Sequence, residues 1–157
     1  MTERDEFFMK RAIALAKEGM HKNAGGPFGA VVVKNDEIVA EGYNKVKLNH
    51  DPTAHAEIVA IREACNKLND SELKDCTLYT SCEPCPMCLG AIYWTRLKMV
   101  YFGSSHKDAA AANFDDQFIY DEIEKNIEDR KVSFVQLGRE EAIGVFKEWQ
   151  AKENKTE

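Results

Sequence analysis

Apolar residues along the chain repeat with two periods, one of about 3.6 residues that is typical of helices and one of two that is typical of strands. Thr2 and Asp51 can cap the first two helices at their N-termini, Gly19 can end the first, and Pro52 suits the first position of the second. The helical period predicts five helices, the fourth of them short, over residues 3–18, 51–68, 84–95, 118–124 and 140–152.

Shorter apolar runs have the length and the flanking turn residues of strands. Asn35-Asp36 supplies a turn after the first run, so we expect the first two strands to form a hairpin. Beyond it, strands alternate with helices, which favours crossover connections and a largely parallel sheet. We therefore predict an α/β fold, a three-layer α-β-α sandwich whose five-stranded mixed sheet carries helices on both faces. The five strands are residues 30–34, 38–44, 76–80, 99–102 and 132–137.

Length and charge limit the class of protein. The chain has 157 residues with 44% apolar composition, so we expect residues 1–157 to form a single domain around one core. Its 21 Lys and Arg against 27 Asp and Glu give a net charge of −6, which disfavours binding that neutralises many phosphates. The charged first residues lead into no long apolar run. We expect a cytoplasmic protein with neither a nucleic-acid nor a membrane partner.

Two segments carry residues that ligate metals, His55-Ala56-Glu57 and Pro84-Cys85-Pro86-Met87-Cys88. One imidazole and two thiolates, from His55, Cys85 and Cys88, suit Zn²⁺ and leave the fourth tetrahedral position for a water or hydroxide, as in catalytic zinc sites. Both segments lie where predicted helices begin, and an α/β sheet forms its ligand site there. The sequence therefore predicts one Zn²⁺ per chain in an open site.

Glu57 is a carboxylate beside a predicted ligand and need not bind the metal itself. Zn²⁺ lowers the pKa of a bound water from about 16 to about 7. A carboxylate within reach can take that proton and later give it to the substrate. We expect Glu57 to do so; the alternative is an ordinary solvated glutamate. The histidines that have no comparable setting, and that we expect to be ordinary polar residues, are His21, His50 and His106.

The cysteines allow other interpretations. Five is an odd number, and three of them lie within seven residues, which favours a metal site over disulfides. Cys85 and Cys88 could be buried as small hydrophobes, or Cys82 could close a structural zinc site. Cys82-x-x-Cys85-x-x-Cys88 could also open an iron–sulfur motif, but Leu89-Gly90-Ala91-Ile92 follows where a further cysteine is needed. A thioredoxin-like role would leave the histidine segment unexplained. We expect Cys82 to point away from the metal.

These segments give the chain a resemblance to the cytidine deaminase superfamily over nearly its whole length. Asp51-Pro-Thr-Ala-His-Ala-Glu57 and Thr80-Ser-Cys-Glu-Pro-Cys-Pro-Met-Cys88 look like the two metal motifs of its purine branch. That branch includes bacterial guanine deaminases and tRNA adenosine deaminases. The resemblance implies the superfamily fold and zinc-dependent hydrolytic deamination.

Other features resemble the guanine deaminases of this branch. The segment 25–30 is similar to one that supplies an aromatic wall, here Phe28, and Asn44 matches an asparagine that hydrogen-bonds the purine. Trp94 stands where tRNA adenosine deaminases usually lack a tryptophan. By the same resemblance, Phe28 and Trp94 wall the base, and Ala56 belongs to the substrate-binding residues. The alternative for both aromatic residues is core packing.

The segment 106–116 resembles the loop that brings in a second catalytic carboxylate, at Asp116. Its alternative is a solvated pair of loop carboxylates, Asp115 and Asp116. The chain departs from the family at Asn113, where glycine is expected, although asparagine tolerates the left-handed conformation. It also has no aromatic residue after Trp149, in a tail that helps to close the pocket in relatives.

The resemblance implies hydrolysis of guanine, a free purine base, to xanthine and ammonia. The first alternative is a tRNA adenosine deaminase; residues 139–157, with four basic and five acidic side chains, are not the basic segment that an RNA partner favours. The second, from another class, is a non-catalytic structural-zinc interaction module. Superfamily members are usually oligomeric, so we expect a homodimer with residues 139–157 as a candidate interface.

Overall fold

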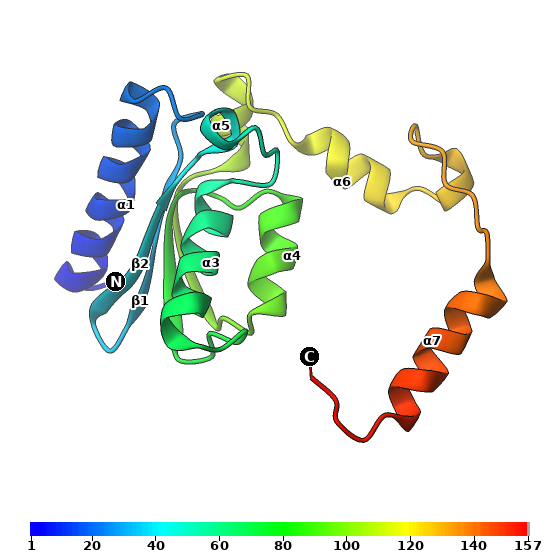
Figure 1. Cartoon of the computed structure of the whole chain (residues 1–157). Helices are drawn as coiled ribbons and strands as arrows, with labels where there is room; N and C mark the ends of the chain where they lie inside the picture. The colour runs from blue at the N-terminus through cyan, green and yellow to red at the C-terminus, as the bar shows by residue number, and fades with distance from the viewer. Residues whose placement is uncertain (157) are drawn as a thin grey trace. The chain divides into compact units, whose positions relative to one another are not determined.

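The computed structural model describes residues 1–156 and divides into two compact units, residues 1–119 and the remainder from Tyr120. Helix α6 (Gln117–Glu124) crosses this division, and the second unit also holds a 3-10 turn (Ile127–Asp129) and α7 (Arg139–Ala151). The other elements form the first unit (Figure 1): α1 (Glu3–His21), β1 (Gly29–Lys34), β2 (Glu37–Tyr43), α2 (Val46–Asn49), α3 (Ala56–Leu68), β3 (Cys76–Cys82), α4 (Pro86–Trp94), β4 (Met99–Ser104) and α5 (His106–Ala111).

The sheet has the strand order β2-β1-β3-β4 and is mixed, as predicted. β1 is antiparallel to both β2 and β3, and only β3 and β4 pair in parallel. The expectation of a largely parallel sheet was therefore wrong. The crossover through α3 does join two strands that run in the same direction, β2 and β3, but the first strand of the hairpin lies between them and runs the other way.

The hairpin and the first helix follow the predicted local chemistry. Asn35 and Asp36 have φ of 50° and 62°, the positive values that a tight two-residue hairpin turn requires. Thr2 caps α1, where it accepts a hydrogen bond from the backbone N–H of Asp5. The helix continues past Gly19 to His21.

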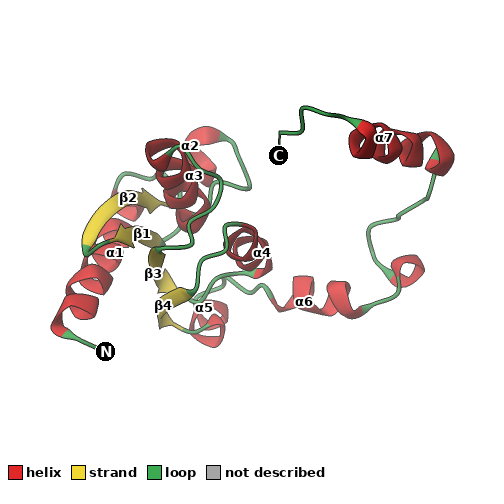
Figure 2. Ribbon diagram, turned by 90° about the horizontal axis from the view of Figure 1, so that it is seen from below, coloured by secondary structure: helices red, strands yellow, loops and turns green. Residues whose placement is uncertain are grey.

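Helices cover both faces of the sheet, with α1 on one face and α3 and α4 on the other (Figure 2). Because successive strand residues point to opposite faces, each strand contributes to two cores. The core on the α1 side comprises Phe8, Ala12, Leu15, Val31, Val33 and Tyr79. The core on the other side includes Ala30, Val32, Ala60, Ile61, Leu78 and Ile92.

The predicted fifth strand is absent from the described residues, so the sheet has four strands. Residues 132–137 form no ladder with another strand, and the side chain of Leu137 is 94% exposed. The alternating apolar pattern suits a strand, but a strand also needs a neighbour for its backbone hydrogen bonds. Within its own unit the segment is accompanied only by helices and turns.

The start of the second helix differs from the prediction because a side chain there accepts a backbone N–H group in a turn. The second predicted helix begins at Ala56 and not at residue 52, since Asp51 accepts the backbone N–H of Thr53 at 2.8 Å in a turn and His55 takes the N-cap position. Helices α2 and α5 were not predicted.

No helix among the described residues has the length and apolar character needed to cross a membrane.

Candidate metal centre and adjoining cavity

The three predicted ligands lie at the starts of two helices on the same face of the sheet. His55 is the N-cap of α3, Cys85 is the N-cap of α4, and Cys88 follows in the first turn of α4. Gly42 lets α3 approach β2 closely, because a Cβ there would lie 2.5 Å from the carbonyl oxygen of Ala56. The two helices begin at the same end of the sheet, and this brings His55 close to Cys85 and Cys88, which are 30 and 33 positions away in the sequence.

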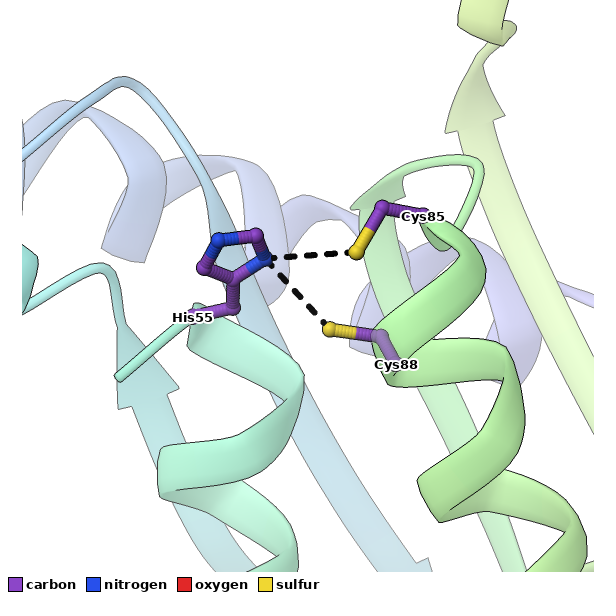
Figure 3. Close-up of side chains that lie close together, drawn as sticks. All are labelled: His55, Cys85 and Cys88. Atoms are coloured by element: carbon purple, nitrogen blue, oxygen red, sulfur yellow. Dashed lines mark hydrogen bonds between the residues drawn. The ribbon is translucent and has the colours of Figure 1, made fainter. Parts of the chain in front are cut away.

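The distances between the ligand atoms suit a zinc ion. His55 Nδ1 lies 3.5 Å from Cys85 Sγ and 3.5 Å from Cys88 Sγ (Figure 3), and the three atoms lie within 4.8 Å of one another. Tetrahedral coordination with Zn–S of about 2.3 Å and Zn–N of about 2.0 Å separates sulfur and nitrogen by about 3.5 Å. His55, Cys85 and Cys88 could therefore hold Zn²⁺.

The thiols of Cys85 and Cys88 have pKa values shifted in opposite directions. The hydrogen bond from Cys88, supported by one from His55, lowers the pKa of Cys85 to about 4. The same contact with Cys85, together with burial, raises the pKa of Cys88. At neutral pH Cys85 is a thiolate, the form that binds metals, and metal binding would displace the proton from Cys88.

Glu57 is a buried carboxyl beside this cluster. It lies in the first turn of α3, is only 6% exposed, and lines the adjoining cavity. Burial raises its pKa, an effect that a hydrogen bond from Cys88 partly opposes. A carboxyl with a raised pKa at a cavity wall can take and release a proton at neutral pH. The alternative of a solvated glutamate does not describe this residue.

Cys82 takes no part in the three-residue cluster. It is buried at the end of β3, where its Sγ lies 3.8 Å from the carbonyl oxygen of Ser105. The geometry thus agrees with an open site of three ligands rather than a closed site of four cysteine and histidine ligands.

A cavity of about 350 Å³ adjoins the cluster and falls within the usual size range of small-molecule sites, about 300–1,000 Å³. Phe28 forms part of its wall, and its ring packs edge-on against Phe114 at a centroid distance of 5.1 Å. The predicted site residues that line it together with the metal ligands His55 and Cys85 are Phe28, Asn44, Glu57 and Asp116.

Two residues expected at the substrate site, Ala56 and Trp94, do not line this cavity. Trp94 ends α4 and is 76% exposed, whereas the candidate ligands Cys85 and Cys88 lie at the start of that helix. Nine helical residues span about 13 Å, too far for Trp94 to wall a base beside the metal of its own chain. Ala56 is fully buried in the core between α3 and the sheet and does not line the cavity.

The two carboxyls at the end of the 106–116 loop, Asp115 and Asp116, lie in different environments. Asp115 is exposed and accepts the backbone N–H of Gln117 at 2.9 Å at the start of α6. Asp116 is half-buried, and burial, followed by the charge of Cys85, raises its pKa. Both line the cavity. Asn113 has φ of 69°, so it adopts the left-handed conformation expected in place of glycine.

Sequence reasoning missed Glu83 and His106, which also line the cavity. The backbone N–H of His106 donates to Glu83 Oε1 at 3.1 Å, and the His106 ring nitrogen Nδ1 lies 3.6 Å from the other carboxylate oxygen. A sequence signal existed, since Ser105 and Asp108 have the spacing of a capping box and do cap α5. That signal would have placed His106 at a helix start beside the sheet edge.

Comparison with known proteins shows similarity over the whole chain. Residues 2–104 match the model of the cytidine and deoxycytidylate deaminase zinc-binding region. The chain is 55% identical over 152 residues to the guanine deaminase of Bacillus subtilis strain 168, covering 97% of each. The X-ray structure of guanine deaminase from Bacillus subtilis matches with a TM-score of 0.95 at 54% identity, covering 100% of this chain and 99% of the other.

Other relatives match a smaller part. A tRNA-specific adenosine deaminase of Buchnera aphidicola subsp. Baizongia pistaciae is 46% identical over 109 residues, which are 69% of this chain and 66% of that protein. The crystal structure of NE0047 in complex with 2,6-diaminopurine matches with a TM-score of 0.68 at 34% identity, over 71% of this chain and 62% of the other.

Proposed function

We propose that this chain, which belongs to the cytidine and deoxycytidylate deaminase zinc-binding family, catalyses the hydrolytic deamination of guanine to xanthine and ammonia. The observation that carries the proposal is a cavity lined by a buried carboxyl, Glu57, and by His55 and Cys85, two members of a three-residue cluster that could hold zinc. Guanine is supported as the substrate by similarity to a guanine deaminase over 97% of the chain, whereas similarity to the tRNA deaminase covers 69%.

The carboxyls of the cavity divide the proton transfers between them. When bound to His55, Cys85 and Cys88, zinc supplies a polarised water as the nucleophile. We assign Glu57 to take a proton from the attacking water and to deliver it to a ring nitrogen, because it is buried beside the cluster with a raised pKa. We assign Asp116 to protonate the departing amine from the loop side of the cavity. The second proton of the water, which is lost as the new carbonyl forms, restores the proton on Asp116. One water is consumed and one ammonia is released.

The remaining cavity residues suit a flat heterocycle. The ring of Phe28 offers an apolar wall, held in place by its edge-on contact with Phe114. Asn44 is only 8% exposed and offers a polar side chain at the same cavity. We propose that these two residues hold the base with its amine-bearing carbon toward the metal. Because Trp94 lies outside the cavity, it takes no part in this arrangement within one chain.

We also propose that the enzyme is a homodimer. Helix α4 leaves Tyr93 and Trp94 more than 70% exposed, and the second unit exposes apolar side chains along residues 132–137. Apolar surface of this kind usually marks an interaction site, and a second copy of the chain would cover it. Sedimentation equilibrium should give the mass of two chains. A monomer at micromolar concentration would contradict the proposal.

Ammonia release across a panel of substrates tests the proposed reaction. Guanine, adenine, cytosine, cytidine and tRNA would be offered to the zinc-loaded enzyme, with the Cys85→Ala variant as a control that lacks one metal ligand. We expect release from guanine to exceed that from every other compound by at least about tenfold, the discrimination that one unpaired buried polar group can give. Release from tRNA with none from guanine would overturn the assignment.

A further inference from the structure

Gly25 lies against the side chain of Asn44 with no space for a side chain of its own. A Cβ at position 25 would lie 2.0 Å from Asn44 Oδ1, 2.8 Å from Cγ and 2.9 Å from the backbone oxygen of Asn44. Gly25 does not have the positive φ that would by itself favour glycine, since Gly138 is the only glycine with a positive φ among the described residues. Glycine is therefore needed here for space.

The backbone around Gly25 has little freedom to move away from Asn44. The backbone N–H of Asn44 donates to the carbonyl oxygen of Phe28 at 3.1 Å. On the other side of the glycine, the carbonyl oxygen of Ala24 accepts the N–H groups of Lys47 and Leu48 at 3.1 and 3.0 Å. The segments before and after Gly25 are thus both bonded to the segment that begins at Asn44. A methyl group at position 25 would have to displace the Asn44 side chain.

The orientation of the Asn44 amide follows from its hydrogen bond. The backbone N–H of Val46 lies 2.9 Å from the amide oxygen Oδ1. A backbone N–H can only donate, so the atom facing it must be the oxygen and not the nitrogen of the amide. The NH₂ group is then the polar group that Asn44 can offer to the cavity that it lines.

We propose that Gly25 is a positioning residue: together with the N–H of Val46, it fixes the Asn44 amide so that a hydrogen-bond donor faces the cavity. Position 44 then selects bases that present an acceptor, such as a carbonyl oxygen or an unprotonated ring nitrogen. This inference rests on the proposed function, in which Asn44 binds the purine. Any side chain at position 25 would break the bond to Val46 and release the amide to rotate.

A double-mutant cycle separates this role from a general effect on folding. Gly25→Ala and Asn44→Ala should each lower kcat/KM for guanine by about 10- to 100-fold, as expected for one hydrogen bond in a buried site. The double variant should lose far less than the product of the two single losses, because two residues that act through one group are non-additive. The 2.9 Å approach of the new Cβ to the backbone oxygen of residue 44 remains in the double variant and accounts for a small additional loss. Zinc content should match that of the wild type in all three variants.

Two further variants sharpen the result. Gly90→Ala is the matched control, since a Cβ there meets no atom within 4 Å, and it should leave kcat/KM unchanged. Asn44→Asp retains an oxygen for Val46 but replaces the cavity-facing donor with an acceptor, so it should lower kcat/KM at least as far as Asn44→Ala. An Asp variant with wild-type activity, or a Gly25→Ala loss that is undiminished in the Asn44→Ala background, would overturn the inference.

A crystal structure of Gly25→Ala tests the geometry independently of the substrate. We expect Asn44 Oδ1 to have left the N–H of Val46. An unchanged hydrogen bond would overturn the inference even if guanine is the substrate. A wild-type enzyme that releases no ammonia from guanine would instead overturn the proposed function, and the geometric result would still decide the role of Gly25.

Discussion

Replacing Asp116 by asparagine tests the second carboxyl of the proposed mechanism. Asp116 is half-buried at the cavity, where burial raises the pKa of its carboxyl. Asparagine has nearly the same shape but can neither accept nor deliver the proton. The neighbouring Asp115 offers a matched control, because its carboxylate accepts the N–H of Gln117 and asparagine can do the same.

General acid–base catalysis contributes about 10²–10⁴-fold to a rate, or about 3–5 kcal/mol of activation free energy. Asp116→Asn should therefore lower kcat for guanine by at least about 10²-fold, and Asp115→Asn by less than about threefold. Ammonia release and xanthine absorbance measure both, with zinc content determined on the same samples. A fully metallated Asp116→Asn enzyme that keeps more than about a tenth of wild-type kcat would refute the assigned role.

Asp116→Asn should also change the stability of the folded protein in a definite direction. An acid whose pKa is raised by folding is disfavoured in its charged form, so the protein loses stability as pH rises from the unfolded pKa of about 3.9 through the raised folded value. Asparagine removes this cost, and Asp116→Asn should unfold at the same or a higher temperature than the wild type at pH 7. A lower melting temperature would mean that the carboxylate stabilises the loop.

Three further predictions concern Glu57, the cysteines and the core. Glu57→Gln should keep its zinc while kcat falls by more than about 10²-fold, measured by ammonia release; turnover above a tenth of wild type would remove Glu57 from the mechanism. Cys82→Ser should retain zinc and activity, whereas Cys85→Ala should lose both in metal analysis; loss of zinc from Cys82→Ser alone would favour a closed structural site. Leu78→Ala, at a side chain that is 0% exposed, should lower the free energy of unfolding by about 2–5 kcal/mol in a denaturant titration, and an unchanged free energy of unfolding would contradict its place in the core.

The clustering of the three candidate ligands could be predicted because their positions depend largely on local chemistry. The two cysteines lie at the start of α4, where Pro86 is visible in the sequence as a helix-starting residue. His55 lies at the start of α3, which the sequence predicted to begin four residues earlier, at residue 52. The hairpin is equally local, since Asn35 and Asp36 tolerate the positive φ that its turn requires. Features of this kind need no knowledge of distant neighbours.

Features that depend on distant neighbours could not be predicted in the same way. Residues 132–137 carry a strand pattern, but the pattern contains no information on whether another strand is available to pair with it. Trp94 shares α4 with Cys85 and Cys88, yet the helix length places it at the opposite end. Nor could the separation of β2 from β3 by β1 be read from the order of the elements along the chain.

The site also contains relationships that spacing along the sequence does not indicate. His106 and Glu83 are 23 residues apart and meet only because β3 and β4 pair in parallel and end at the same edge. Gly25 and Asn44 meet because the turn before β1 packs against the segment after β2. The first contact depends on the strand order, and the second depends on the register of the β1–β2 hairpin, which pairs Gly29 with Tyr43.

Isotope incorporation from labelled water tests the central claim most directly. The zinc-loaded enzyme would be incubated with guanine in water enriched in the heavy oxygen isotope, and the purine product and ammonia would be measured by mass spectrometry and by a coupled assay. The account predicts xanthine with one labelled oxygen, at the carbon that lost its amine, and one ammonia for each xanthine. Guanine recovered unchanged, while adenosine in tRNA is converted with release of ammonia, would contradict it.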